Sequence, residues 1–396
     1  MKKIYLASPH VLGNEKKYVN DALDSNWIAP LGEYVDRLED GIKELTGCGE
    51  AVAVASGTAA IHLALIEAGV KEGDKVLCSD MTFTASANPI VYCGAMPVFI
   101  DCDDETFNMS PEVLRKAIEI HRPKAVVVAS IYGQPAKLDE IRAICDDYNK
   151  MIDAQGLSEE NRCVLIEDAT EVLGATKNGV YAGTFGDYGT FSFNGNKIIT
   201  TSGGGMLVTK SEKHASHALY MATQAKDKSR YYEHSEIGYN YRLSNISAAI
   251  GVAQLEKLTE KIELKKKIHD MYKEAFAKFK DYGVNVLDAP EDSTSNYWLS
   301  VLILNNDCYT TPEEIVDALG REGIEARQVW KPLHTQKTFL FSPFLTDVKD
   351  GGSNSEYFFE HALCLPSDTN MTEDDQQRVI SIVNTVIHQN IANNYC

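Results

Sequence analysis

The sequence lacks the short motifs of the commonest zinc and nucleotide sites. None of its nine cysteines stands in a C-x-x-C pair, which excludes a zinc ribbon and a thioredoxin-type site. No G-x-G-x-x-G motif joins an expected strand to a helix, and no glycine-rich turn has the spacing of a P-loop. No stretch approaches the roughly 20 apolar residues of a membrane span, and the first apolar run is too short for a signal peptide. We therefore expect no metal site, no membrane association and a cytoplasmic location.

Positive charge is also scarce. The chain has 38 Lys and Arg against 57 Asp and Glu, a formal net charge of −19, which argues against general binding of nucleic acids or anionic membranes. A small anionic ligand stays possible, because the local charge of a site can oppose the global sign. The scattered cysteines are typical of buried free thiols in a reducing compartment. With 396 residues and 44% apolar composition, the chain is long enough for two or three domains with a sizeable core.

Short apolar strands alternate with helical patterns through the first half, which predicts an α/β fold with a largely parallel sheet. The expected strands are 51–55, 75–79, 97–101, 125–129, 163–167, 190–193 and 205–209. The expected helices in this half are 59–68, 84–93 and 138–148, and the polar stretch 151–162 is expected to be a surface excursion. After it, we expect a helical connector at 245–280, a strand at 297–304, and helices at 312–322 and 381–394. We place a large domain at 1–256 and a smaller α+β domain at 257–396.

One lysine lies between an apolar strand and a glycine-rich turn. Lys197 follows the expected strand 190–193 and precedes Gly203–Gly205, while the strand upstream ends at Asp168. A pyridoxal phosphate (PLP) enzyme needs an amine that forms an imine with the cofactor aldehyde and an acid that pairs with the pyridinium nitrogen. Alone, the lysine reads as a solvated surface residue and the aspartate as a helix cap. The two in this order, with a phosphate site upstream, favour PLP.

The phosphate site is predicted where strand 51–55 meets the next helix. Small residues there, Gly57 and Thr58 among them, let backbone N–H groups face an anion at the positive end of the helix dipole. An ordinary helix N-cap is the alternative interpretation. Ser192, near the end of its strand, offers a hydroxyl to the same phosphate.

Two further side chains are candidates for contact with the cofactor ring. Phe83 begins a helix after a strand end, where ligands bind in open α/β sheets, so it either stacks on the ring or packs in the core. Glu171 lies three residues after Asp168, on the same face of a helix if one starts there, near the ring hydroxyl or the substrate.

Two later segments are rich in polar and aromatic residues. Residues 238–245 are either a binding segment or a polar loop before a helix capped at Ser244. Residues 330–334, together with Arg327, form a basic and aromatic cluster in an acidic chain, which indicates a place for phosphates or a carboxylate, or else a surface loop.

These motifs together resemble the DegT/DnrJ/EryC1/StrS family of PLP-dependent nucleotide-sugar aminotransferases, over nearly the whole chain. The matching segments are 26–32, 56–62, 167–169, 191–197 and 238–245. The resemblance implies PLP-dependent transferase fold type I, like aspartate aminotransferase, with a homodimer that shares its active sites. It also implies PLP held as an imine, with pyridoxamine phosphate as the intermediate form of the cofactor.

The same resemblance implies roles for particular residues. Lys197 becomes the imine-forming lysine and proton shuttle, and Asp168 the partner of the pyridine nitrogen. The remaining cofactor contacts are Gly57, Thr58, Phe83, Glu171, Ser192 and, from the neighbouring subunit, Asn240. The nucleotide-sugar side is expected to be lined by Asn26, Trp27, Arg242, Lys331 and His334.

Within the family, segments 194–206, 26–32 and 330–336 are most similar to 4-aminotransferases of bacillosamine type. These use glutamate, which becomes 2-oxoglutarate, and aminate C4 of a UDP-linked 2-acetamido-4-keto-6-deoxy hexose for bacterial glycan or protein glycosylation. A GDP-linked (perosamine-like) or dTDP-linked keto sugar stays open as the substrate. Sugar dehydratases of the same fold carry histidine at the lysine position, so Lys197 argues against that activity. A non-catalytic PLP-binding regulator would need a DNA-binding element, and no basic helix-turn-helix pattern is present.

Overall fold

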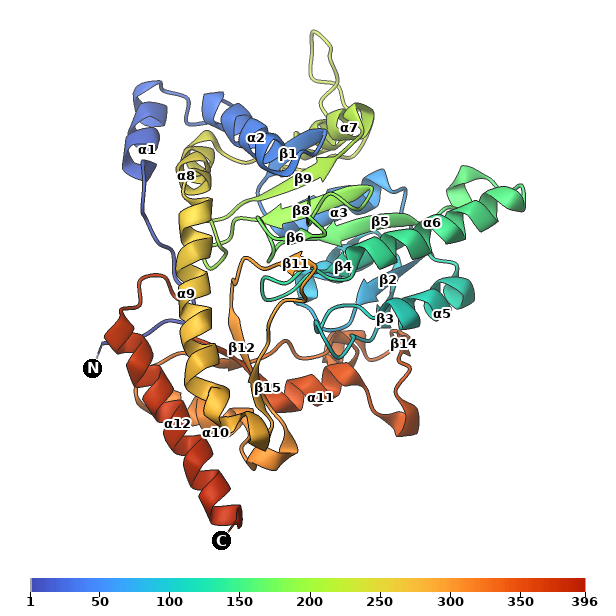
Figure 1. Ribbon diagram of the computed structural model, residues 1–396. Helices are drawn as coiled ribbons and strands as arrows, with labels where there is room; N and C mark the ends of the chain where they lie inside the picture. The colour runs from blue at the N-terminus through green and yellow to red at the C-terminus, as the bar shows by residue number, and fades with distance from the viewer. Residues whose placement is uncertain (1, 396) are drawn as a thin grey trace.

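The computed structural model describes residues 2–395, and only the backbone of residues 350 and 395 (Figure 1). The chain builds a large mixed sheet from its first half and a second, smaller sheet from its last third. The cysteines within the described residues are free thiols, as predicted, and six of these eight are buried. Cys396, for which a free thiol was also expected, lies outside the described residues.

The large sheet has eight strands and is parallel except around β9, which is antiparallel to both of its neighbours. In spatial order the strands are β1 (Glu50–Val54), β9 (Gly205–Thr209), β8 (Tyr188–Ser192), β5 (Val164–Asp168), β4 (Ala125–Ala129), β2 (Lys75–Ser79), β3 (Met96–Ile100) and β14 (Phe344–Leu345). The central strands are apolar along their length because helices cover both faces of the sheet. The carboxyl ends of β5 and β8 therefore meet at one edge, beside the start of the helix that follows β1.

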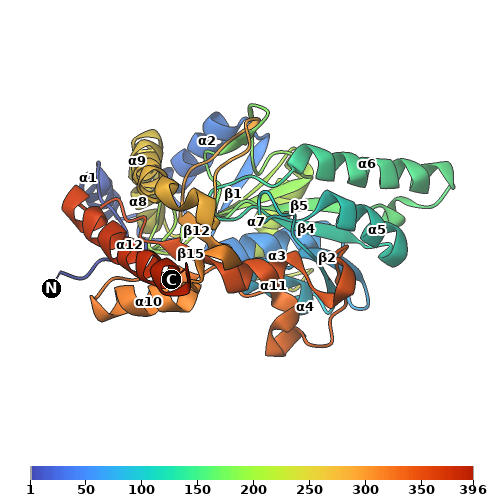
Figure 2. The ribbon, with the colours of Figure 1, turned by 60° about the horizontal axis from the view of Figure 1, so that its bottom comes forward.

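Helices pack on both faces of this sheet (Figure 2). One face is covered by α2 (Glu33–Thr46), α5 (Pro111–His121), α6 (Leu138–Ala154) and α8 (Asn245–Leu255). The other is covered by α3 (Gly57–Glu67), α4 (Asn88–Tyr92) and α7 (Glu212–Ala222). The short α1 (Glu15–Asp24) packs on α8. These two layers bury a continuous apolar core on each side of the strands, which holds the strand ends in fixed positions.

The last third of the chain forms a four-stranded antiparallel sheet with its own core, below the large sheet in Figure 1. Its strands, in spatial order, are β10 (Val284–Val286), β12 (Ser300–Leu304), β15 (Ala362–Leu365) and β13 (Arg327–Gln328). Its helices are α9 (Leu258–Phe276), α10 (Pro312–Arg321), α11 (Asn354–His361) and α12 (Glu373–Tyr395). A small third sheet joins β11 (Ser293–Thr294) to β6 (Thr176–Lys177) and β7 (Val180–Tyr181). The start of the chain contributes here too, because Ile4 forms a parallel bridge with Ile324.

Several expected elements differ in extent from those observed. The helix expected at 84–93 is divided into a 3-10 turn (Thr84–Ser86) and α4, with a proline in the first turn of α4. Helix α6 runs on to Ala154, so the stretch expected as an excursion begins as helix, because Ile152 is buried one turn after Tyr148. Helix α12 begins eight residues before the expected 381, since its acidic first turn hides the apolar periodicity but suits the helix dipole.

The expected connector at 245–280 is two helices and a 3-10 segment. Helices α8 and α9 are separated at Glu256 and Lys257, and a 3-10 helix covers Ala277–Tyr282. The strand expected at 297–304 begins only at Ser300, so Trp298 lies in the segment leading into β12. That difference matters for the site described next.

Candidate active site

A cavity of about 310 Å³ lies at the carboxyl ends of β5 and β8, against the start of α3. Seven of the residues predicted to bind the cofactor line it: Gly57, Thr58, Phe83, Asp168, Glu171, Ser192 and Lys197. They come from segments between residues 57 and 197, and the parallel sheet brings these segments to one edge. The cavity is therefore assembled from strand ends and one helix N-terminus.

The amine of Lys197 is held at the cavity by two neighbours. Its Nζ donates to Oε1 of Glu171 at 3.1 Å and lies 4.1 Å from the centre of the Trp298 ring. The lysine side chain is 12% exposed and that of Glu171 is 5% exposed, so the ion pair is largely removed from water. A lysine whose largely buried amine is held at a cavity in this way is placed for nucleophilic attack on a ligand carbonyl.

Glu171 is buried and has two hydrogen-bond donors. Its Oε1 accepts from Lys197, and its Oε2 accepts from the backbone N–H of Tyr132 at 2.9 Å. Burial raises the pKa of Glu171, while the Lys197 charge and the Tyr132 N–H oppose that rise without cancelling it. The lysine and the glutamate therefore form a pair of groups between which a proton can be held.

Asp168 ends β5, between the ends of β4 and β8, and its side chain is buried. Its Oδ2 accepts a hydrogen bond from Ser86 Oγ at 2.5 Å, and its Oδ1 accepts a long one from the Thr170 N–H at 3.3 Å. No cation pairs with it among residues 2–395. A buried carboxylate with neutral donors only, facing a cavity, suits a ligand that brings its own positively charged N–H.

The first turn of α3 forms an anion cradle beside these carboxylates. Ser56 caps the helix by accepting from the Ala59 N–H, and the first N–H groups of a helix have no intrahelical acceptor. Their positive end favours a phosphate, and Ser192 lies against the same turn. A Cβ on Gly57 would come within 3.0 Å of both Ser192 and Thr170, so the cradle has little room for a side chain there.

Gly205 permits the close approach of β9 to this cradle. A Cβ on Gly205 would lie 2.5 Å from the carbonyl carbon of Ser56 and 2.6 Å from the nitrogen of Gly57. We expect Gly205→Ala to displace the start of α3, to destabilise the protein by about 1–3 kcal/mol and to weaken PLP binding. Chemical unfolding and a PLP titration measure both effects.

The matched control for this prediction is Gly195→Ala. It lies in the lysine turn, and a Cβ there would meet no atom within 4 Å. Equal stability and equal PLP affinity of the two variants would contradict the steric argument.

Aromatic side chains border the same edge of the cavity. Phe83 is half exposed, and its ring centre lies 5.3 Å from that of Trp330. Trp330 in turn stacks on Tyr132 with the ring centres 6.4 Å apart. Phe83 therefore presents a free ring face toward a planar ligand rather than packing inside the core.

The structure does not bring the six other predicted site residues into this cavity. Asn26 and Trp27 are exposed after α1, Asn240 is exposed and bridges Thr223, and the Lys331 side chain is exposed. Arg242 is engaged elsewhere, because it donates to Glu39 Oε1 at 2.5 Å and to the carbonyl of Ala53 at 3.0 Å. In the single chain, Arg242 thus joins α2 to β1.

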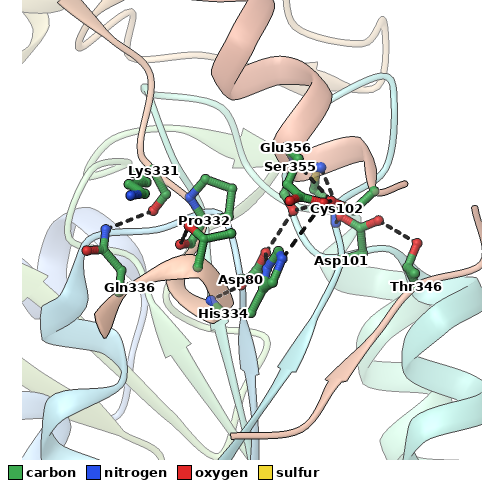
Figure 3. Close-up of polar contacts among 12 residues, drawn as sticks. Asp80, Asp101, Cys102, Lys331, Pro332, His334, Gln336, Thr346, Ser355 and Glu356 are labelled. Carbon is green, nitrogen blue, oxygen red and sulfur yellow. Dashed lines mark hydrogen bonds and ion pairs between the residues drawn. The ribbon is translucent and has the colours of Figure 1, made fainter. Parts of the chain in front are cut away.

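His334 belongs to a separate buried network with Asp80 at the end of β2 (Figure 3). Its Nδ1 lies 2.7 Å from Oδ2 of Asp80, its backbone N–H donates to Oδ1 at 2.8 Å, and its ring stacks on Phe344. Ser355 Oγ donates to the same Asp80 oxygen at 2.7 Å. This network fixes segment 330–336 to the large sheet and so positions Trp330 beside Phe83.

The His334–Asp80 pair predicts a pH dependence of stability. Burial disfavours the charged form of His334, but the Asp80 hydrogen bond and the charges of Asp80, Glu356 and Asp101 together outweigh it and raise the pKa of His334 above 6.5. A raised folded-state pKa gives stability that is complete below about pH 6.5 and is lost as the pH rises through the raised value. We expect His334→Gln to lower the unfolding midpoint more at pH 6 than at pH 9.

Thermal unfolding of wild type and variant at both pH values tests this. His388→Gln, an exposed histidine on α12, is the control and should shift neither midpoint. A loss that is the same at both pH values would show that the charge of His334 is not what stabilises the network.

Several residues at the site were not predicted. Trp298 contacts the lysine amine, Ser86 donates to Asp168, and Tyr132 donates its N–H to Glu171. Ser130 and Asn194 also line the cavity. Ser86 and Tyr132 follow strands of the same sheet, so their position after strand ends was the one available signal. Trp298 lies far from Lys197 in the sequence, and no local pattern indicated the contact between them.

Comparison with known proteins identifies the class. The family model of the DegT/DnrJ/EryC1/StrS aminotransferases matches residues 10–384, and the chain belongs to this family. It is therefore a PLP-dependent sugar aminotransferase of α/β fold, like aspartate aminotransferase, as the sequence predicted. The donor set described above fits PLP, with an amine for its aldehyde, a carboxylate for its ring nitrogen and a helix N-terminus for its phosphate.

Individual relatives cover almost the whole chain. EpsN of Bacillus subtilis, named as a pyridoxal phosphate-dependent aminotransferase, is 48% identical over 393 residues, 98% of this chain and 96% of EpsN. GDP-perosamine synthase of Caulobacter vibrioides is 33% identical over 390 residues, 98% of this chain and 99% of that protein. The structure of the sugar aminotransferase Spr1654 from Streptococcus pneumoniae in its PMP form is 25% identical, covers both chains fully and superposes with a TM-score of 0.87.

Within residues 2–395, none of the helices combines the length and the apolar character that crossing a membrane requires. The same residues contain no group of three or more His, Cys, Asp or Glu side chains placed to hold a metal ion.

Proposed function

We propose that this protein transfers an amino group from glutamate to C4 of a UDP-linked 2-acetamido-4-keto-6-deoxy hexose. The product is the UDP-linked 4-amino sugar, of bacillosamine type, for bacterial glycan or protein glycosylation. The observation that carries the chemistry is the Lys197–Glu171 pair on a cavity that also holds the buried carboxylate of Asp168. Such an arrangement serves amino transfer through PLP.

Each residue of the cavity has a proposed task. PLP, when bound, withdraws electrons from the carbon that carries the amino group. The amine of Lys197 would hold the cofactor through its aldehyde and would serve as the group that moves protons at the donor carbon. Glu171 holds that amine in place through a hydrogen bond of 3.1 Å. Asp168 keeps the ring nitrogen protonated, and Phe83 covers one ring face.

The phosphate and the nucleotide are proposed to involve a second subunit. Gly57, Thr58 and Ser192 would bind the phosphate from within one chain. Asn240 is exposed and away from its own cavity, which supports a homodimer in which it reaches the neighbouring subunit's phosphate. Asn26, Trp27 and Lys331 are likewise exposed, and we propose that they contact the nucleotide sugar. For Arg242 and His334, whose polar groups are engaged within the chain, we propose an indirect role in shaping that side.

The UDP-linked sugar is supported by the pattern of residues 194–206 and 26–32. A GDP-linked 4-keto sugar is the second candidate, and GDP-perosamine synthases 33–38% identical to this chain favour it. The free thiols of the described cysteines support a location in a reducing compartment, and we propose the cytoplasm.

A substrate panel tests the proposal. The PLP-loaded protein is offered glutamate with UDP-, GDP- and dTDP-linked 4-keto-6-deoxy sugars, and products are identified by mass and NMR. We expect the UDP-linked 2-acetamido sugar to give the highest kcat/KM and an amine at C4. A tenfold preference for the GDP-linked sugar would replace the first candidate by the second, and an amine at C3 would contradict both.

A further inference from the structure

A second, smaller recess of about 170 Å³ lies directly behind the wall of the lysine cavity. Neighbouring residues divide the two spaces: Ile131 and Lys197 line the cavity, while Tyr132 and Asn196 line the recess. Trp298 also lines the recess, and its ring is the one that the Lys197 amine contacts at 4.1 Å. A molecule in the recess would therefore lie close to the Lys197 amine, behind the residues that divide the two spaces.

The free polar groups of the recess are hydrogen-bond donors. Arg327, on the edge strand β13, has no ion pair or hydrogen bond from its guanidinium among the described residues. The indole Nε1 of Trp330 is buried and has no partner there either. The hydroxyl of Tyr132 accepts from the Trp330 backbone N–H at 2.6 Å, which leaves its own proton to donate. Three unused donors around one small space favour an anionic oxygen group.

The carboxylate of the recess already has partners. Glu325, its one carboxylate, pairs with Lys3 at 2.9 Å and accepts from the Leu6 N–H at 3.3 Å. Lys3 is its ion-pair partner, and the charge of Arg327 also lowers the pKa of Glu325, although no ion pair or hydrogen bond joins these two side chains. Leu6, Ala7, Leu299 and the two tryptophan rings form an apolar part of the wall that suits methylene groups, and Asn196 and Gln328 are its other polar residues.

We propose that this recess binds a carboxylate of the amino donor, with Arg327 as its counterion and Trp330 Nε1–H and the Tyr132 hydroxyl as further donors. The inference rests on the proposed function, because it takes glutamate as the donor. A volume of about 170 Å³ is below the roughly 300 Å³ at which pockets for drug-sized ligands begin, so it suits a short acid rather than a nucleotide. Arg327 would thereby be a specificity residue for the donor half of the reaction.

Binding of glutarate, a five-carbon dicarboxylate without an amine, tests the site independently of turnover. We expect Arg327→Gln to raise the dissociation constant of glutarate for the PLP-loaded protein at least tenfold, measured by calorimetry. Arg327→Lys should recover part of the loss, because it keeps the charge but lacks the planar guanidinium that can donate two hydrogen bonds to one carboxylate. Trp330→Phe should weaken binding about threefold. The control, Arg321→Gln at the end of α10, removes an arginine that does not line the recess and should leave the constant unchanged.

Steady-state kinetics separate the donor from the sugar. In Arg327→Gln we expect KM for glutamate to rise at least tenfold and KM for the nucleotide sugar to stay within twofold. Equal glutarate binding by wild type and variant, or a rise in the sugar KM alone, would overturn the inference; the latter would assign Arg327 to a phosphate of the nucleotide. A wild-type protein that binds glutarate but accepts no amino group from glutamate would instead overturn the donor in the proposed function.

Discussion

Lys197→Ala is expected to lower kcat by about four orders of magnitude while the protein still folds and binds PLP. In the proposed function this amine both binds the cofactor aldehyde and moves the proton, and proton transfer by a positioned side chain alone contributes roughly 10²–10⁴ in rate. The phosphate cradle of α3 and the carboxylate of Asp168 remain in the variant, so cofactor affinity should fall far less than activity. Single-turnover kinetics with glutamate and absorbance spectra of the loaded protein measure the two effects.

The control for this prediction is Lys210→Ala. Lys210 is an exposed lysine just after β9 and outside the cavity, so its loss should leave kcat within twofold. Added ethylamine, which supplies the missing amine, should restore part of the activity of the Lys197 variant only. If Lys197→Ala retained near-normal turnover, another group would have to carry the proton, and the site would need a different reading.

Asp168→Asn is expected to lower kcat by about 10²–10³, with a smaller loss of PLP affinity. The change keeps the shape of a buried side chain but removes the negative charge that would keep a bound ring nitrogen protonated, and loss of one preorganised electrostatic partner typically has this magnitude. The Ser86 hydroxyl can still donate to the amide oxygen, so folding should survive. kcat from steady-state assays and the absorbance maximum of the bound cofactor are the measurements.

A graded variant locates the effect in the charge. Ser86→Ala removes the 2.5 Å hydrogen bond to Asp168 but keeps the carboxylate, so kcat should fall tenfold or less. Should Ser86→Ala and Asp168→Asn lose activity equally, the hydrogen-bond geometry rather than the charge would be the important property of Asp168.

Local patterns in the sequence predicted seven residues that line the cavity. Asp168 ends a strand, Lys197 follows one and Gly57 opens a helix, so the ends of parallel strands bring them together. A local pattern does not predict contacts between residues that are distant in the sequence. Nothing near Trp298 indicates that its ring meets the Lys197 amine, because the contact depends on how the last third of the chain packs against the first.

The residues predicted to line the nucleotide-sugar side show a related limit: a local pattern does not reveal a distant residue that already binds the side chain. Arg242 and His334 have side chains that suit anions, but Glu39 and Asp80 engage them first. Those acids lie more than 200 residues away in the sequence, so residue type alone did not reveal that the charges are already matched. Arg327, by contrast, belongs to the cluster that the sequence predicted as a place for phosphates or a carboxylate, and it lines the recess beside Trp330.

The bridge between Ile4 and Ile324 has a consequence for the order in which this protein is made. Ile4 has its partner more than 300 residues later in the sequence, and β3 meets β14 only at Phe344. During synthesis, the strand edge at Met96–Ile100 and the segment around Ile4 therefore lack these partners until residues 324–345 have been made. Truncation before Ile324 should therefore leave insoluble product rather than an active fragment, since sheet edges without partners promote aggregation.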